Sequence, residues 1–185
     1  LDDRIVAVGE IGLDFFRDYA PRDEQRRVFT AQLRLAAEHG KPVIVHSRAA
    51  DDETAELLAE FGGTVVLHCF SSPELLPVAL DRGYYVSFAG NVTYPNAAEL
   101  RGAARAVPAE RILAETDSPY LAPQPVRGKR NEPAYVVHTV ASLAEAAADL
   151  ARWTAALGVV MALVPLPIWT SAALGSIAAV LSLVV

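Results

Sequence analysis

The feature that most limits how this chain can fold is a repeated alternation of short apolar runs with helical stretches. The apolar runs cover residues 4–10, 41–48, 64–70, 83–90 and 112–117. Such continuous β-branched runs are typical of parallel strands that are buried on both faces. Helical patterns separate them, so the order β-α-β-α-β-α-β-α-β predicts right-handed βαβ units and an α/β fold with a parallel sheet or barrel.

The bulk composition limits the class of protein further. The 185 residues carry 16 basic and 22 acidic side chains, for a net charge of −6. That balance argues against a protein held to nucleic acid by its overall charge, but not against an enzyme with a locally positive site. The single cysteine, Cys69, excludes an internal disulfide framework and is consistent with a reducing, cytoplasmic location.

Residues that can bind a metal ion come at the end of four of the predicted strands. These residues are Glu10, His46, His68 and Asp117. Strands that run parallel present their carboxyl ends on one side of the sheet, where barrel enzymes place their chemistry. Taken alone, Glu10 is explained equally well as a solvated carboxylate and His46 as a core histidine. Together, the four residues predict one divalent-metal site, and carboxylate with imidazole suits zinc, manganese or magnesium.

Five stretches of the sequence resemble the TatD-type metal-dependent deoxyribonucleases of the amidohydrolase-like (β/α)8 barrels. The matching stretches are Gly9–Asp14, Pro42–Arg48, Leu67–Ser71, Glu115–Leu121 and Arg127–Pro133. They occur in the family order and cover nearly all of residues 1–150. The resemblance implies that the fold is part of a TIM-type barrel containing about five of the eight strands.

The resemblance also implies a role for individual residues. Glu10, His46, His68 and Asp117 would bind divalent metal, with two ions in a complete site, and Asp117 and Glu10 would be catalytic. Arg48, Arg127 and Lys129 would contact substrate phosphate. An alternative for the 127–130 loop is a basic segment that is simply solvated.

The sequence departs from the family pattern at its beginning. The family opens with a strand that carries a His-x-His pair, which supplies further metal ligands, and no His-x-His occurs here. We therefore expect residues 1–150 to be a truncated hydrolase barrel with an incomplete ligand shell. A catalytically incomplete fragment is an alternative interpretation of this chain.

The second departure is the end of the chain, where residues 153–185 carry no charge. A run of about 20 apolar residues is long enough to span a bilayer, but Pro165 and Pro167 interrupt this one. We treat residues 151–185 as a separate apolar tail unlike the family. It is interpreted as a frameshifted end, a membrane segment, or an apolar helix that covers the edge of the sheet.

The function predicted from these observations is metal-dependent hydrolysis of phosphodiester bonds in DNA, acting on single strands or strand ends. A local basic loop on an acidic protein suits a site that admits a strand end better than a surface that coats nucleic acid. The alternative on the same scaffold is hydrolysis of another ester or an amide. The predicted location is cytoplasmic, with membrane association only through residues 153–185.

Overall fold

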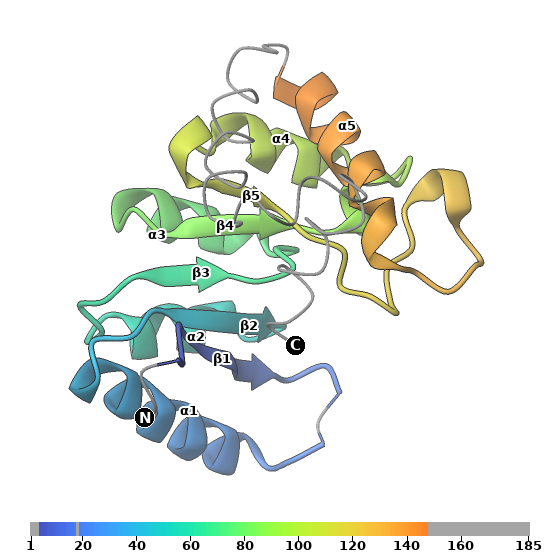
Figure 1. Ribbon diagram of the computed structural model, residues 1–185. Helices are drawn as coiled ribbons and strands as arrows, with labels where there is room; N and C mark the ends of the chain where they lie inside the picture. Colours follow the sequence, from blue (N-terminus) through green and yellow to red (C-terminus); the bar gives the residue numbers. More distant parts are fainter. Residues whose placement is uncertain (1–3, 18, 148–185) are drawn as a thin grey trace. The chain divides into compact units, whose positions relative to one another are not determined.

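The computed structural model describes residues 4–17 and 19–147 (Figure 1). The chain divides into two compact units between Val86 and Ser87, and each unit is described by itself. The predicted uncharged tail lies outside the described residues. Among the helices of the described ranges, none is both long and apolar enough to cross a membrane.

The first unit consists of parallel strands joined by helices. Its elements are β1 (Val8–Asp14), α1 (Arg22–Glu38), β2 (Val43–Arg48), α2 (Asp51–Leu58), β3 (Val65–Leu67), a 3₁₀ turn (Pro73–Leu75), α3 (Leu76–Asp81) and the first half of β4 (Tyr85–Phe88). β2 pairs in parallel with β1 on one side and β3 on the other, and β3 pairs with Tyr85 and Val86 of β4. Neighbouring strands in space are therefore neighbours in sequence, as expected for successive βαβ units.

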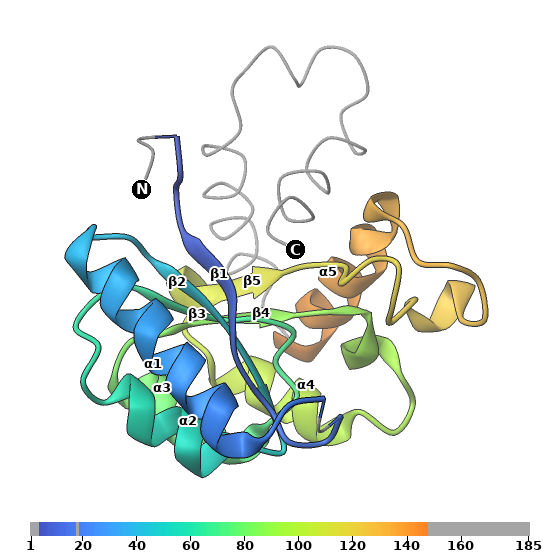
Figure 2. The same ribbon diagram turned by 90° about the horizontal axis from the view of Figure 1, so that it is seen from below.

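Helix α1 shows why these residues cover the sheet. Phe29, Leu33 and Ala36 are buried and lie on one face of the helix at intervals of four and three residues. This face packs against β1 (Figure 2), where Leu13 is fully buried. Gly40 ends the helical segment in the left-handed conformation, with φ +59°, a region that a glycine enters at no steric cost.

The second unit begins within β4 and continues through shorter elements. They are a 3₁₀ turn (Gly90–Thr93), α4 (Ala98–Ala106), a 3₁₀ turn (Ala109–Arg111), β5 (Ile112–Ala114), two further 3₁₀ turns (Gln124–Val126 and Pro133–Tyr135) and α5 (Val136–Ala147). The Glu115 N–H, directly after β5, donates to the Phe88 carbonyl of β4 at 2.9 Å, so β5 lies beside β4. Helices α4 and α5 pack together, and the Arg105 side chain donates to the Ala146 carbonyl.

The order of strands and helices is as predicted, and β2 ends at Arg48 as predicted, but the predicted ends of β1 and β5 are wrong. β1 continues to Asp14, so Glu10 lies inside the strand, and β2 continues two residues beyond His46. β5 ends at Ala114, so Asp117 lies in the following loop. His68 directly follows β3, in agreement with the prediction.

Candidate metal centre

Glu10 lies at an irregularity in the pairing of β1 with β2. Val8 is opposite Val43 and Ile11 is opposite Val45, so β1 uses one residue more than β2 over this interval. An extra residue of this kind bends a strand and re-aims a side chain. Two glycines let β1 approach β2 closely here: a Cβ on Gly9 would lie 2.7 Å from the Ile44 Cβ, and one on Gly12 would lie 2.0 Å from the His46 carbonyl oxygen.

The His46 ring lies between two carboxylates of β1. Its Nδ1 is 2.8 Å from Glu10 Oε1, and its Nε2 is 3.3 Å from Asp14 Oδ2. About a third or less of each of these three side chains is exposed, so solvent screens the contacts only in part. Both ring nitrogens therefore have acidic neighbours, which holds the ring plane in place.

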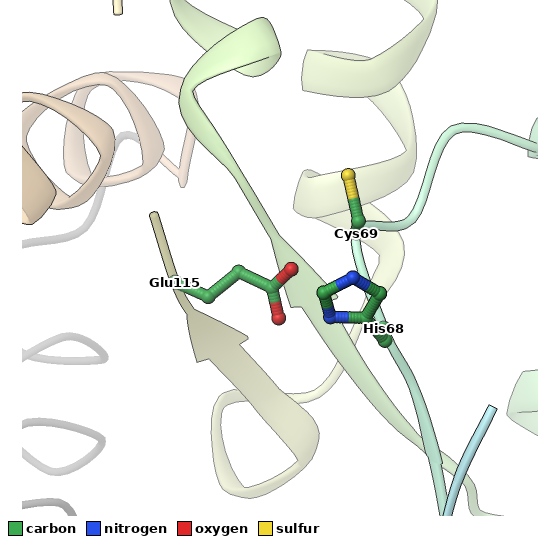
Figure 3. Close-up of side chains that lie close together, drawn as sticks. All are labelled: His68, Cys69 and Glu115. Atoms are coloured by element: carbon green, nitrogen blue, oxygen red, sulfur yellow. The ribbon is translucent and has the colours of Figure 1, made fainter. Parts of the chain in front are cut away.

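His68 completes the cluster in the first unit. It follows β3 directly, and its Nε2 lies 3.7 Å from Glu10 Oε2, with only 9% of its side chain exposed. The two oxygens of Glu10 thus face two different imidazoles. The next residue, Cys69, adopts φ +45°, and Figure 3 shows its side chain leaving the backbone in a different direction from the His68 ring.

The electrostatics of the cluster follow from these contacts. The hydrogen bond with His46 lowers the pKa of Glu10, against the effect of burial, and the charges of His68 and His46 lower it further. The same hydrogen bond with Glu10 raises the pKa of His46, again against burial. The arrangement therefore stabilises an ionised carboxylate at Glu10, which is the form that binds a cation.

Asp14 is a member of the cluster that the sequence analysis did not select. Burial acts to raise the pKa of Asp14, but the backbone N–H groups of Arg17 and Phe16 and the His46 ring together lower it. The Asp14 Oδ1 accepts from Phe16 N–H at 3.0 Å and Arg17 N–H at 2.8 Å, while Oδ2 faces His46. The sequence did contain an indication of Asp14, because this residue ends the Gly9–Asp14 motif. Its position beside His46 follows only from the extension of β1 to Asp14.

Two pairs of donor atoms in this cluster are each close enough to share a divalent ion, although the donors of Glu10, His46 and His68 do not all lie within 4.8 Å of one another. Carboxylate oxygen and imidazole nitrogen lie about 2.0–2.2 Å from zinc, so two donors on one ion are at most about 4.4 Å apart. The 3.7 Å between His68 Nε2 and Glu10 Oε2 meets this limit. The 2.8 Å between His46 and Glu10 also meets it, although this pair is a direct hydrogen bond in which a proton occupies the place between the donors.

Asp117 belongs to the second unit and lies in a tightly held loop after β5. Its backbone has φ +54°, and its carbonyl accepts from Tyr120 N–H at 2.8 Å. The buried Asn131 fastens this loop, because its Nδ2 donates to the Thr116 and Tyr120 carbonyls at 2.7 and 2.6 Å. The 127–133 motif thus supplies a residue that shapes the backbone around Asp117, a role that the sequence analysis did not foresee.

Glu115 is a second acidic residue that the sequence analysis did not select. It follows β5 directly and is 93% buried, and its Oε2 accepts from the Ser87 hydroxyl at 2.5 Å (Figure 3 shows its side chain). Ser87 is itself fully buried. A buried carboxylate costs free energy unless it is paired, so Glu115 is positioned by its neighbours rather than solvated at the surface.

The three basic residues predicted to contact substrate lie in different surroundings. The Arg48 guanidinium carbon lies 4.0 Å above the centre of the Phe16 ring, in the first unit. In the second unit the Arg127 guanidinium carbon lies 4.0 Å above the Tyr94 ring, and Lys129 is exposed. Arg48 is therefore the predicted phosphate contact that the structure places in the same unit as Glu10 and His46.

Comparison with known proteins decides the family. A family model described as TatD related DNase matches residues 1–157. The chain belongs to the TatD family. The resemblance read from the five motifs is thereby confirmed.

Similar curated proteins are described as metal-dependent hydrolases or as an exonuclease. The chain is 41% identical over 147 residues to the uncharacterized metal-dependent hydrolase YabD of Bacillus subtilis, covering 77% of this chain and 58% of that protein. It is 47% identical over 141 residues to the uncharacterized metal-dependent hydrolase YcfH of Escherichia coli K12, covering 73% and 52%. It is 41% identical over 159 residues to the 3′-5′ ssDNA/RNA exonuclease TatD of Klebsiella pneumoniae, covering 81% and 60%. The chain therefore spans a little over half the length of these relatives.

A solved TatD structure confirms the fold class. YJJV, a TatD homolog from Escherichia coli K12, aligns with a TM-score of 0.78 at 33% identity, covering 87% of this chain and 65% of that one. The chain thus has the α/β fold of part of a TIM-type barrel, with strands in the order β1-β2-β3-β4-β5.

Proposed function

We propose that this TatD-family chain contributes the metal site of a hydrolase that cleaves phosphodiester bonds of DNA from a strand end. The observation that carries the proposal is the cluster of Glu10, His46 and His68, in which one carboxylate faces two imidazoles at 2.8 and 3.7 Å. Such a set of donors suits zinc, manganese or related divalent ions, and magnesium where water completes the shell.

In this proposal the residues of the cluster bind the metal ion and orient one another as its ligands. Glu10 provides an ionised carboxylate whose two oxygens are directed to different neighbours, and His46 and His68 supply imidazole nitrogens. Asp14 holds the His46 ring from its other side, as carboxylates that orient metal-binding histidines commonly do. A bound divalent ion would lower the pKa of a water molecule and stabilise negative charge on a phosphoryl oxygen.

Asp117 is proposed as the acceptor of the proton that the attacking water gives up. This role rests on the Glu115–Leu121 motif and on the ability of a carboxylate to act as a general base. Within its own unit the loop is fixed by Asn131, so the Asp117 backbone is already ordered before substrate binds.

The proposed substrate is a single strand or strand end. The Klebsiella pneumoniae relative is named a 3′-5′ ssDNA/RNA exonuclease, which favours this class over other esters. The net charge of −6 argues against binding through overall charge, so we assign phosphate contacts to the local cations Arg48, Arg127 and Lys129. The proposed location remains cytoplasmic.

Metal binding and hydrolysis test the proposal with two independent measurements. Calorimetric titration with Mn²⁺ should show binding to the wild-type chain and a loss of at least about tenfold in affinity for Glu10→Gln, because a ligand oxygen is replaced by a neutral amide. Glu38→Gln, an exposed carboxylate at the end of α1, is the matched control and should bind as wild type.

Hydrolysis of a single-stranded oligonucleotide with Mn²⁺ is the second measurement. Asp117→Asn should abolish cleavage while the circular dichroism spectrum stays close to that of wild type. Metal binding without cleavage of DNA, together with cleavage of a simple carboxylic ester, would instead identify a hydrolase of another ester. Equal Mn²⁺ affinity in wild type and Glu10→Gln would overturn the metal site.

A further inference from the structure

Phe16 is an apolar aromatic side chain that the fold leaves in water. Its side chain is 65% exposed, although it lies only two residues beyond Asp14 of the metal cluster. The Arg48 guanidinium carbon lies 4.0 Å above the centre of its ring. Within residues 4–17 and 19–147 no carboxylate lies at ion-pair distance from the Arg48 guanidinium.

We propose that Phe16 and Arg48 form a stacking platform for the terminal nucleobase of a single-stranded nucleic acid. This inference rests on the proposed hydrolase function and adds a contact for the substrate base to the phosphate contact already proposed for Arg48. Aromatic rings and arginine planes are the surfaces on which proteins stack unpaired bases, because every base has a π face. The charge of Arg48 also favours the approach of an anionic strand.

The loop that carries Phe16 is held in position before any substrate binds. Asp14 Oδ1 accepts the backbone N–H of Phe16 and of Arg17 at 3.0 and 2.8 Å. The Gln25 side chain of α1 closes the other end, since it accepts from Asp14 N–H and donates to the Asp14 and Ala20 carbonyls. A platform ordered in advance loses little conformational entropy when a base stacks on it.

The platform is connected directly to the metal cluster. Arg48 follows His46 by two residues on β2, so both side chains lie on the same face of the strand. Two residues of a strand advance about 6.6 Å, a distance comparable with the length of about one to two nucleotides of a nucleic-acid strand. A terminal base on the platform therefore keeps the first phosphodiester bonds within reach of Glu10 and His46.

A second arginine–phenylalanine pair in the same unit shows what a purely structural contact looks like. The Arg22 guanidinium carbon lies 4.3 Å above the Phe15 ring, but Phe15 is buried, with 8% of its surface exposed. Phe15 thus fills the interior, whereas Phe16 presents its ring outward. The difference in exposure is the reason that we assign substrate contact to Phe16 and not to Phe15.

Fluorescence anisotropy with a labelled single-stranded DNA 12-mer, in EDTA to prevent cleavage, tests the platform. Phe16→Ala should weaken binding roughly 5- to 150-fold, the range that corresponds to one lost base-stacking contact. Phe16→Trp should retain binding, and Arg22→Ala, which removes the structural pair, should bind as wild type.

Oligonucleotides that lack one terminal base separate stacking from a general effect on the loop. Wild type should lose affinity for a strand that is abasic at its 3′ or its 5′ end, and Phe16→Ala should not distinguish that strand from the intact one. An equal effect of Phe16→Ala on intact strands and on both abasic strands would overturn the platform.

The outcomes also separate this inference from the hydrolase proposal. Wild type that binds and cleaves single-stranded DNA, with Phe16→Ala unchanged in both, would overturn the platform and leave the hydrolase intact. Wild type that neither binds nor cleaves nucleic acid would overturn both.

Discussion

The side chain of Asn131 should determine the conformation of the loop that carries Asp117. It is 2% exposed and makes three hydrogen bonds: its Nδ2 donates to the Thr116 and Tyr120 carbonyls, and its Oδ1 accepts from Glu132 N–H at 3.0 Å. Asn131→Ala removes all three. At about 1 kcal/mol for each neutral hydrogen bond, the loss is about 3 kcal/mol, and a further 1 kcal/mol or more arises because the buried Thr116 carbonyl loses a donor.

Asn131→Asp provides a sharper comparison, because it preserves the shape of the side chain. The carboxylate replaces the amide that donates, so an ionised oxygen faces the two carbonyl oxygens. We therefore expect Asn131→Asp to destabilise the loop at least as much as Asn131→Ala. Gln124→Ala is the control: Gln124 is an exposed amide of the same segment, and its loss should cost less than about 0.5 kcal/mol.

Amide hydrogen exchange of a peptide covering residues 112–122 measures this loop directly. Tyr120 N–H, which donates to the Asp117 carbonyl at 2.8 Å, lies within that peptide. A local loss of about 4 kcal/mol corresponds to exchange roughly 1,000-fold faster. The reasoning would be refuted if Asn131→Ala exchanged like Gln124→Ala, or if Asn131→Asp were clearly milder than Asn131→Ala.

Two further predictions concern the first unit. Gly12→Ala should lower the free energy of unfolding, measured by urea denaturation, by at least about 1–3 kcal/mol. The reason is that Gly12 has φ +138° and that the added Cβ would lie 2.0 Å from the His46 carbonyl oxygen. Gly62→Ala is the control and should be neutral or slightly stabilising, because nothing lies within 4 Å of its added Cβ. The pair of Glu10 and His46 should stabilise the fold most between about pH 4.5 and 6.5. The pKa of Glu10 is lowered from 4.5, so its contribution is lost as the pH falls through that lowered value, and the pKa of His46 is raised from 6.5, so its contribution is lost as the pH rises through the raised value. The stability difference between wild type and Glu10→Gln should therefore shrink on both sides of this window, and a difference independent of pH would contradict the assignment.

The order of elements was readable from the sequence because apolar runs and helical periods follow directly from burial. The ends of β1 and β5 could not be predicted in this way. The predicted strand ends at Glu10, yet the absence of a Cβ on Gly12 lets β1 continue beside His46. β5 ends at Ala114 because the chain then enters a loop in which Asp117 has the left-handed conformation. No pattern in the local sequence predicts that conformation.

The candidate site was predictable in part for the same reason. His68 follows a short strand, so its placement needed only the end of that strand. The contribution of Asp14 depends on the length of β1, and that of Asn131 depends on a loop folding back over 15 residues to reach Thr116. These contacts are tertiary, so a pattern within one stretch of sequence does not contain them.

The additional residue in β1 has a consequence for how the metal cluster is specified. Side chains of a strand alternate between its two faces, so adding or removing one residue exchanges the faces for everything on one side of the change. β1 advances three residues from Val8 to Ile11 while β2 advances two from Val43 to Val45. The direction of the Glu10 carboxylate therefore depends on whether the number of residues in that interval is odd or even. A chain that kept every motif residue but had one residue fewer before Ile11 would still contain the ligand residues. Its Glu10 carboxylate, however, would point to the other face of the sheet, away from His46 and His68.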